Sequence, residues 1–192
     1  MLSVKKLLLV IAAAAMAACA YSPQQVMIQP ELEVADDIYG QGRIVTVLAE
    51  DQRSNKAIGS RGGAYPGTSL ITPANDVGEA MVKAAKAGLR QQGFSVDSDQ
   101  PPAATVKVIV DTLTYENDKD TVTAKVNLLA VLRVEINVAE KNHSGVYKSA
   151  ISQQLVIKPT AATNEKLINK VLSQTLQRAL NDPKVKAFLS NS

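Results

Sequence analysis

The sequence predicts an α+β fold: a two-layer sandwich in which two main helices pack on one face of an antiparallel or mixed sheet of about four to five strands. Three observations lead to this prediction. Apolar and polar residues alternate over residues 122–138, which is typical of a strand with one buried face. Residues 76–92 and 163–181 carry apolar residues at the helical period. Short turns separate the long strands, so the strands pair as neighbours and leave one sheet face for the helices to cover.

The first 18 residues have the three parts of a secretory signal. Lys5 and Lys6 form the positive start, residues 7–16 are apolar, and small residues precede Cys19. The apolar run is shorter than the roughly 20 residues that cross a bilayer, so a transmembrane anchor is the weaker interpretation. We therefore expect residues 1–18 to be removed.

Residues 16–19, Met-Ala-Ala-Cys, resemble the bacterial lipobox. This resemblance implies transfer of diacylglycerol to the Cys19 sulfur, cleavage before Cys19 and acylation of the new amino group. Several acyl chains, each contributing about 0.8 kcal/mol per buried CH₂, make a stable anchor. Ala20 stands where an Asp would favour the inner membrane. The prediction is therefore an anchor in the outer membrane of a Gram-negative bacterium, with the domain facing the periplasm. The alternative is an ordinary signal peptide, which would leave an unpaired thiol in an oxidising compartment.

Composition and charge argue against some classes of function. Removing residues 1–18 takes away two lysines and lowers the formal net charge from +3 to +1. The chain has no Trp and no basic patch with interleaved aromatic residues, so we expect no nucleic-acid binding. Cys19 is the only cysteine, so no internal disulfide can form and the core must hold the domain. We expect a lipidated N-terminus and polar tether over 19–41 and a single α/β domain over 42–192, long enough for a real core.

The predicted tether contains prolines and polar residues, but it is not uniformly polar. Val26, Ile28, Leu32 and Val34 leave room for a short extended piece on the edge of the domain.

The first elements of the domain are read from β-branched residues and from glycines. Residues 43–50 predict the first strand. Residues 54–75 are rich in Gly and Pro and predict a long loop or loose hairpin, with short pairing segments at Ile58 and at residues 70–71.

The helix predicted over 76–92 has signals at both ends. Asp76 followed by Glu79 imitates a capping box, and Gly93 stands where a helix-ending glycine belongs.

Three consecutive strands are predicted over 105–115, 122–138 and 146–158. The predicted turns between them are residues 117–120 and 141–145. The odd positions of the middle strand form its outer face, and two of these, Leu129 and Val131, are apolar.

The C-terminal part is predicted to be helical. Thr163 is the expected cap of a helix that runs to Asn181, and Asp182-Pro183 opens a last short helix.

Several residue patterns that could carry chemistry are more simply explained as structure. His143 is the only histidine and is read as a solvated turn residue, because zinc sites take several His or Cys ligands. Glu116, Asp118 and Asp120 echo the start of a calcium loop but lack its glycine and its closing glutamate. We expect no catalytic residue, no metal site and no cofactor.

Four residues remain as candidates for a binding or structural role. Asp51 and Arg53 are two apart at the end of a strand and so share a face, where they can pair or hold the loop that follows. Arg61 and Tyr65 lie in the glycine-rich stretch 61–67, which lacks the Gly-Lys-Ser/Thr of a phosphate loop and is read as a partner-contacting surface loop.

The chain as a whole resembles the YajG family of bacterial lipoproteins. The features that carry the resemblance are Ala17-Ala18-Cys19, the proline-containing tether, residues 44–47 leading to 51–53, residues 57–59, and a C-terminal helix followed by Asp182-Pro183. The resemblance implies an envelope lipoprotein without an established activity, and it transfers no catalytic residue.

We therefore expect a non-enzymatic lipoprotein that binds another envelope component: a protein, peptidoglycan or lipid. The first alternative is a small-ligand or glycan-binding module, which a pocket near Asp51 and Arg53 would favour. The remote alternative is a cell-wall hydrolase, which would need paired carboxylates in a cleft or His143 beside a nucleophile.

Overall fold

The structure is a computed structural model that describes residues 22–33, 38–63, 65–118 and 124–190. The predicted signal, Cys19, and part of the predicted tether lie outside the described residues, as does Asp120.

The described residues form one mixed sheet of seven strands and three α-helices. The strands are β1 (Gln24–Val26), β2 (Val45–Asp51), β3 (Gly59–Ser60), β4 (Leu70–Pro73), β5 (Ala104–Asp118), β6 (Ala124–Val138) and β7 (Lys141–Leu155). The helices are α2 (Val77–Gln91), α3 (Ala161–Leu180) and α4 (Pro183–Ser190), and a short 3₁₀ helix, η1, spans Pro66–Thr68.

The prediction of a four- to five-stranded sheet with two main helices is wrong. The strands left out of that count are β1, β3 and β4, which have only two to four residues each. The sequence indicated them only as short pairing segments at Ile58 and residues 70–71 and as a short extended piece in the tether. A segment of that length cannot display the alternation that identifies a strand in sequence. Of these three strands, only β3 pairs with the long strand β5, while β4 pairs with β3 and β1 pairs with β4. The sheet is mixed because β1–β4, β2–β5 and β3–β5 are parallel pairs.

Strand β5 is the centre of the sheet. Along one edge, β2 pairs with its first half in parallel from Val45↔Ala104 to Asp51↔Val110, and β3 pairs with its second half at Gly59↔Tyr115. The sheet then continues through β4 to β1. A register shift at Asp111 marks a β-bulge where β2 ends. The bulge lies where β5 changes partner.

The three long strands β5, β6 and β7 have 15 residues each and pair antiparallel, which confirms the predicted meander. The alternation predicted for β6 is also confirmed, since its even positions from Val126 to Ile136 are at most 2% exposed. The predicted turn at 141–145 is wrong. Residues 141–145 lie within β7, and Val138 pairs with Lys141, so the turn is Ala139-Glu140 with Ala139 at φ 48°.

Helix α2 begins and ends as predicted. The carboxylate of Asp76 accepts a 2.8 Å hydrogen bond from the backbone N–H of Glu79, and Gly93 follows the helix at φ +86°. Helix α3 begins earlier than predicted, because Thr160 rather than Thr163 is its N-cap. The Oδ1 atom of Asp182 accepts from the N–H of Lys184 at the start of α4, as the Asp-Pro pair predicted.

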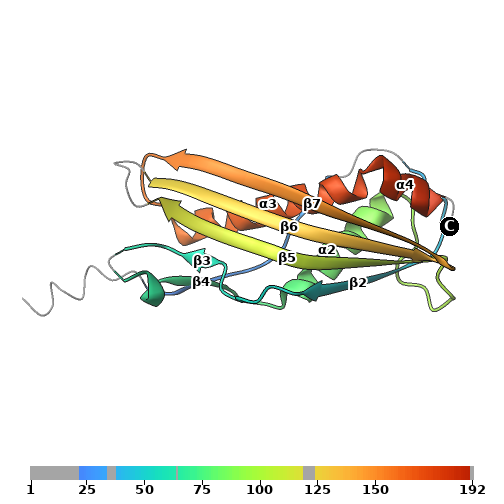
Figure 1. Cartoon of the computed structure of the whole chain (residues 1–192), viewed down its shortest axis with the longest axis horizontal. Helices are drawn as coiled ribbons and strands as arrows, with labels where there is room; N and C mark the ends of the chain where they lie inside the picture. Colours follow the sequence, from blue (N-terminus) through green and yellow to red (C-terminus); the bar gives the residue numbers. More distant parts are fainter. Residues whose placement is uncertain (1–21, 34–37, 64, 119–123, 191–192) are drawn as a thin grey trace, which may run out of the picture.

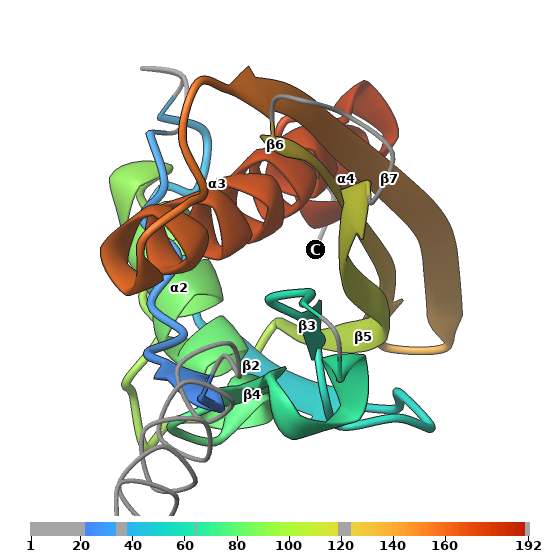
Figure 2. The same cartoon turned by 90° about the vertical axis from the view of Figure 1, so that its left-hand side faces the viewer.

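The helices cover one face of the sheet, and the other face of the long strands is bare (Figure 1). Seen from the end of the molecule, the sheet curves around α3, with α2 beside it (Figure 2). The core lies between these layers and is formed by the inward residues of β2, β5 and β6 with the apolar stripes of α2 and α3.

Part of the predicted tether belongs to the folded body. Val26, Ile28 and Leu32 are buried, with exposed fractions of 0%, 2% and 8%. Residues 24–26 pair with β4, and the chain then runs on between α2 and α3. The short extended piece allowed by the sequence is therefore present. The burial continues beyond β1, because Ile28 and Leu32 also belong to the core. The body begins near residue 24 rather than residue 42.

Candidate functional site

Asp51 and Arg53 form the pair that the sequence indicated. Arg53 Nε and Nη2 donate to Asp51 Oδ1 and Oδ2 at 2.8 and 2.9 Å, so the contact is bidentate. The two side chains are only 14% and 4% exposed. Lys56 Nζ lies 3.2 Å from Asp51 Oδ2 and donates to the Asp51 carbonyl. Burial on its own would raise the pKa of Asp51, but the hydrogen bonds and charge of Arg53 outweigh it and lower the pKa.

One nitrogen atom of the Arg53 guanidinium makes no hydrogen bond. Among the described residues, the buried Nη1 atom of Arg53 has no hydrogen-bond partner. A hollow of about 580 Å³ lies against the pair, and its lining includes Lys56, Thr72, Asp76 and Val77. The start of α2 thus borders the hollow, whose lining holds the carboxylates of Glu50, Asp51 and Asp76 as well as the cationic side chains of Arg53 and Lys56. The arrangement can accept a small polar group, and it also fixes the chain where β2 ends.

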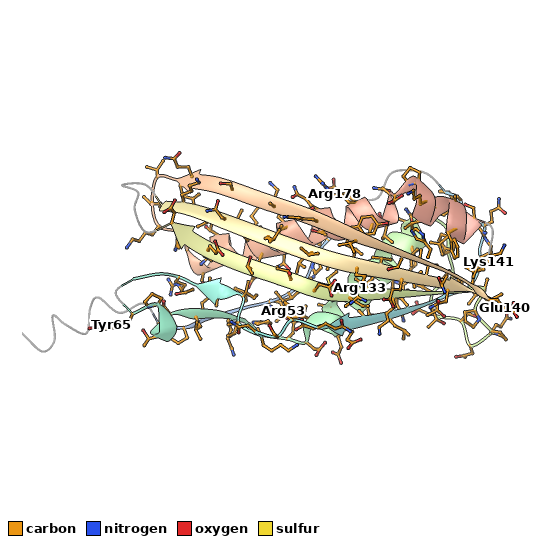
Figure 3. All side chains as sticks on the ribbon, viewed as in Figure 1. Arg53, Tyr65, Arg133, Glu140, Lys141 and Arg178 are labelled. Carbon is orange, nitrogen blue, oxygen red and sulfur yellow. The ribbon has the colours of Figure 1, made fainter. Side chains whose placement is uncertain are left out.

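Arg61 and Tyr65 do not join this site. Tyr65 lies at one end of the molecule, well away from Arg53 (Figure 3). The Tyr65 side chain is 70% exposed. Arg61 Nη1 donates to the carbonyl of Ser22 at 3.2 Å, and the Arg61 carbonyl accepts from Asn117 Nδ2 at 2.9 Å. The four predicted binding residues therefore form two groups at different places in the fold.

The bare sheet face carries a charged network that the sequence analysis did not predict. Arg133 on β6 donates to Asp111 Oδ1 at 3.2 Å, to Glu135 Oε1 at 2.9 Å and to Gln52 Oε1 at 2.9 Å. The Asp111 carboxylate raises the pKa of Arg133 further. The sequence pattern that could have indicated the network is Arg133 and Glu135 at alternate positions of one strand. The other partners of Arg133, Gln52 and Asp111, depend on the strand register and on the bulge.

Apolar residues lie beside this network on the same face. Leu48 on β2 is 49% exposed and Val146 on β7 is 65% exposed. Leu129 and Val131 on β6 are half-buried, as expected for apolar residues on an outer face. The bare face thus combines apolar side chains with ion pairs whose positions are set by the strands.

The N-terminal segment that follows β1 is held by side-chain amides. Asn169 on α3 accepts from the N–H of Gln29 at 2.7 Å and donates to the carbonyl of Met27 at 2.8 Å. Asn75 brackets Ile28 in the same way, accepting at 2.8 Å and donating at 3.0 Å. Hollows of about 770 and 530 Å³ flank the segment along α3 and α2. We call residues 27–33 the strap.

His143 is not the solvated turn residue that the sequence predicted. It lies in β7, half-buried, with its ring 5.7 Å from that of Phe188 on α4. Its Nε2 atom is buried and has no hydrogen-bond partner among the described residues. Glu116 and Asp118 also lie in a strand rather than the predicted turn, because β5 extends to Asp118. Within the part of the chain that the structure describes, no cluster of three His, Cys, Asp or Glu residues could hold a metal ion.

A family model described as "uncharacterized lipoprotein" matches residues 30–190. The chain belongs to this lipoprotein family. No curated protein matches the lipoprotein in sequence. Among the helices in the described ranges, none combines the length and apolar character that crossing a bilayer requires.

Comparison with solved structures gives one match with a TM-score above 0.5 among the three described here. The lipoprotein resembles protein XCC0632 from Xanthomonas campestris at a TM-score of 0.57 and 9% identity, covering 86% of this chain and 98% of that one. It is also similar to a putative neuraminyllactose-binding hemagglutinin homolog from Helicobacter pylori (TM-score 0.48, 11% identity, 87% and 97% covered). A third match is lipoprotein GNA1162 from Neisseria meningitidis (TM-score 0.26, 13% identity, 69% and 96% covered). The last two scores are below 0.5 and carry no conclusion about this chain.

Proposed function

We propose that this chain is a YajG-type lipoprotein, anchored through acyl chains on Cys19 in the periplasmic face of the outer membrane, and that its body is a non-enzymatic module that binds another envelope protein. Membership of a lipoprotein family over residues 30–190 and the lipobox-like residues 16–19 support the anchor. Ala20 supports the outer membrane.

The observation that carries the binding role is the bare outer face of the long strands. Leu48, Val131 and Val146 lie on it beside the Arg133 network. Protein interfaces combine apolar and aromatic contacts with arginine and a polar rim, and rigid strands hold such groups in place. Peptidoglycan, a polar polymer, would make little use of the apolar residues. A protein partner uses both parts of this face.

The anchor is tested by the mass of the mature N-terminus. We expect a peptide that begins at Cys19 and carries diacylglycerol and a further acyl chain. The Cys19→Ser protein is the control and should lack both additions. A mature wild-type peptide with a free thiol would contradict the anchor.

The binding role is tested by photo-crosslinking in cells. A photoreactive residue at Val146, on the outer face, should give a discrete crosslinked adduct, and mass spectrometry should identify the partner in it. A photoreactive residue placed in that partner should crosslink back to this protein. The matched control is Ile38, which is similarly exposed, at 74% against 65%, but lies beside Gly93 at the end of α2, in the helical layer. The adduct should also be lost when Val131 is replaced by Asp. Equal labelling at both positions, or none, would contradict the proposal.

The absence of enzymatic activity is part of the proposal. The His143→Ala protein is expected to match wild type in envelope-integrity assays, with folding checked by circular dichroism. Loss of function in a folded His143→Ala protein would instead favour the hydrolase.

The hollow beside Asp51 and Arg53 supports a second candidate function, the binding of a small ligand or glycan. The Nη1 atom of Arg53, which has no hydrogen-bond partner among the described residues, favours a ligand with a hydrogen-bond acceptor. The test is calorimetry with muropeptides and with inorganic phosphate. Lys56→Ala should weaken any specific binding, whereas Lys83→Ala on α2, which does not line this hollow, should leave it unchanged. Heats indistinguishable from dilution for every probe would remove this candidate.

A further inference from the structure

The chain enters the body at one particular end of the molecule. The strand registers place Gln24 beside Ile71, Ile71 beside Gly59, and Gly59 beside Tyr115. Strand β5 runs on from Tyr115 toward this end and stops at Asp118, while β1 runs away from it. The residues before Gln24 therefore leave the body at the end where β5 finishes.

Two neighbouring exposed apolar side chains lie at the same end. Strand β7 finishes here, since Leu155 pairs with Ala124, the first residue of β6. The next two residues, Val156 and Ile157, are 92% and 75% exposed. The connector then reaches Ala161, whose carbonyl accepts a 2.9 Å hydrogen bond from Gln24 Nε2. Val156 and Ile157 thus lie on the short path between the end of β7 and the point where the chain enters.

Tyr65 lies at this end as well, opposite the end that carries the Glu140-Lys141 turn (Figure 3). Tyr65 precedes η1 near β3 and β4, whereas Val156 and Ile157 follow β7 at the other edge of the sheet, so the three side chains are spread across this end. Exposed apolar side chains grouped on one part of a soluble body mark a protein or membrane contact. Tyrosine is enriched at membrane interfaces, where its ring meets the acyl boundary and its hydroxyl meets water.

The length of chain between Cys19 and the body is short. Arg61 Nη1 donates to the carbonyl of Ser22, so the chain is attached to the body three residues after Cys19. Three extended residues span at most roughly 11 Å. An acylated Cys19 would lie in the bilayer interface. Because only three residues separate Cys19 from Ser22, this end of the body would lie close to the bilayer surface.

We propose that the end of the body that carries Tyr65, Val156 and Ile157 rests on the lipid bilayer, with these side chains in its interfacial region. This inference rests on the proposed acylation of Cys19. In this orientation the long strands extend from the membrane into the periplasm. The bare sheet face is then exposed to the periplasm and does not contact the lipid. The body would be an oriented platform rather than a domain on a long flexible tether.

The chain offers a matched pair of reporters for this contact. It contains no Trp, so one introduced Trp gives an unambiguous fluorescence signal. Ile157 is 75% exposed at the anchored end. Ile38 is 74% exposed at the other end, beside Gly93, which follows α2. The 15 residues of β5 that separate the two ends span about 45 Å.

The experiment uses the acylated Ile157→Trp and Ile38→Trp proteins, reconstituted in phosphatidylethanolamine–phosphatidylglycerol vesicles with and without brominated acyl chains. Flotation reports the anchor, and quenching of Trp emission by bromine reports the contact. Both proteins should float. Ile157→Trp should lose most of its emission in brominated vesicles and shift to shorter wavelength, and Ile38→Trp should change little. Val156→Trp serves as a second reporter if Ile157→Trp unfolds.

The outcomes separate the two proposals. If the proteins float but the Ile157→Trp and Val156→Trp reporters are quenched no more than the Ile38→Trp reporter, the inference is overturned while the anchor stands. If none of the proteins floats, the anchor fails and the inference fails with it.

Discussion

The Tyr115 hydroxyl donates a 2.8 Å hydrogen bond to the Oδ1 atom of Asn164, and both side chains are buried. The amide of Asn164 in turn donates to Gln24 Oε1 at 2.9 Å. This chain of polar groups links β5, α3 and β1 through the core. Burial raises the pKa of Tyr115 to about 12, so its hydroxyl keeps its proton at neutral pH.

Tyr115→Phe should destabilise the protein, because Asn164 would lose its donor in a place that water does not reach. The expected cost is about 1–3 kcal/mol in the free energy of unfolding. Urea denaturation measures it, and Tyr65→Phe, at an exposed position, is the control that should change little. Equal stabilities for the two variants would show that the buried hydrogen bond contributes nothing.

Asp51→Asn should be costly at neutral pH, since it leaves the buried Arg53 guanidinium without its counter-charge. We expect a loss of about 3 kcal/mol, the lower end of the range for removing one partner of a buried pair. Asp97→Asn, which breaks the more exposed contacts to Lys86 and Arg90, should cost less.

The effect of Asp51→Asn should also depend on pH in a defined direction. The pKa of Asp51 is lowered in the folded protein, so its contribution is complete above the unfolded value of about 3.9 and is lost as pH falls through the folded pKa. The difference between wild type and Asp51→Asn should therefore shrink on acidification below about pH 4. A difference that grows in acid would contradict the assigned ion pair.

Asn169→Ala should loosen the strap, because one side chain supplies hydrogen bonds to both Met27 and Gln29. Losing about 1.4 kcal/mol of local stability would speed amide exchange of residues 27–29 about tenfold. Hydrogen–deuterium exchange measures this directly. Lys166→Ala, an exposed change on the same helix, is the control and should leave the rate unchanged.

Gly59→Ala should destabilise the edge of the sheet. A Cβ atom at Gly59 would lie 1.9 Å from the carbonyl oxygen of Tyr115, so the backbones of β3 and β5 would have to separate. We expect a loss of more than about 2 kcal/mol, typical of a backbone clash in a packed region. Gly67→Ala, where a Cβ atom meets nothing within 4 Å, should be neutral or stabilising by up to about 1 kcal/mol. Thermal unfolding of the pair distinguishes a local clash from a general effect of alanine.

Where a pattern is repeated over many residues, the prediction from sequence was good. β6 has 15 residues and α2 has 15, so each displays its period several times. The Asp51–Arg53 contact was predicted from a shared strand face, but β2 ends at Asp51, and the contact forms in the chain that follows, where the Asp51 carboxylate also accepts from the backbone N–H of Arg53. The turn after β6 was misplaced, since Asn-His-Ser-Gly has turn-forming residues that the antiparallel register with β6 overrides.

The sequence by itself determined the long strands, the two large helices with the caps of α2, and the close pairing of Asp51 with Arg53. Each of these depends on neighbours within a few residues along the chain, or on one period repeated many times. Only the tertiary structure decided the partners of the short strands, the contacts of Arg133 with Gln52 and Asp111, and the docking of the strap. In those cases the free energy comes from groups far apart in sequence, such as Gln24 with Ile71 or Met27 with Asn169, and no local pattern encodes which of them will meet.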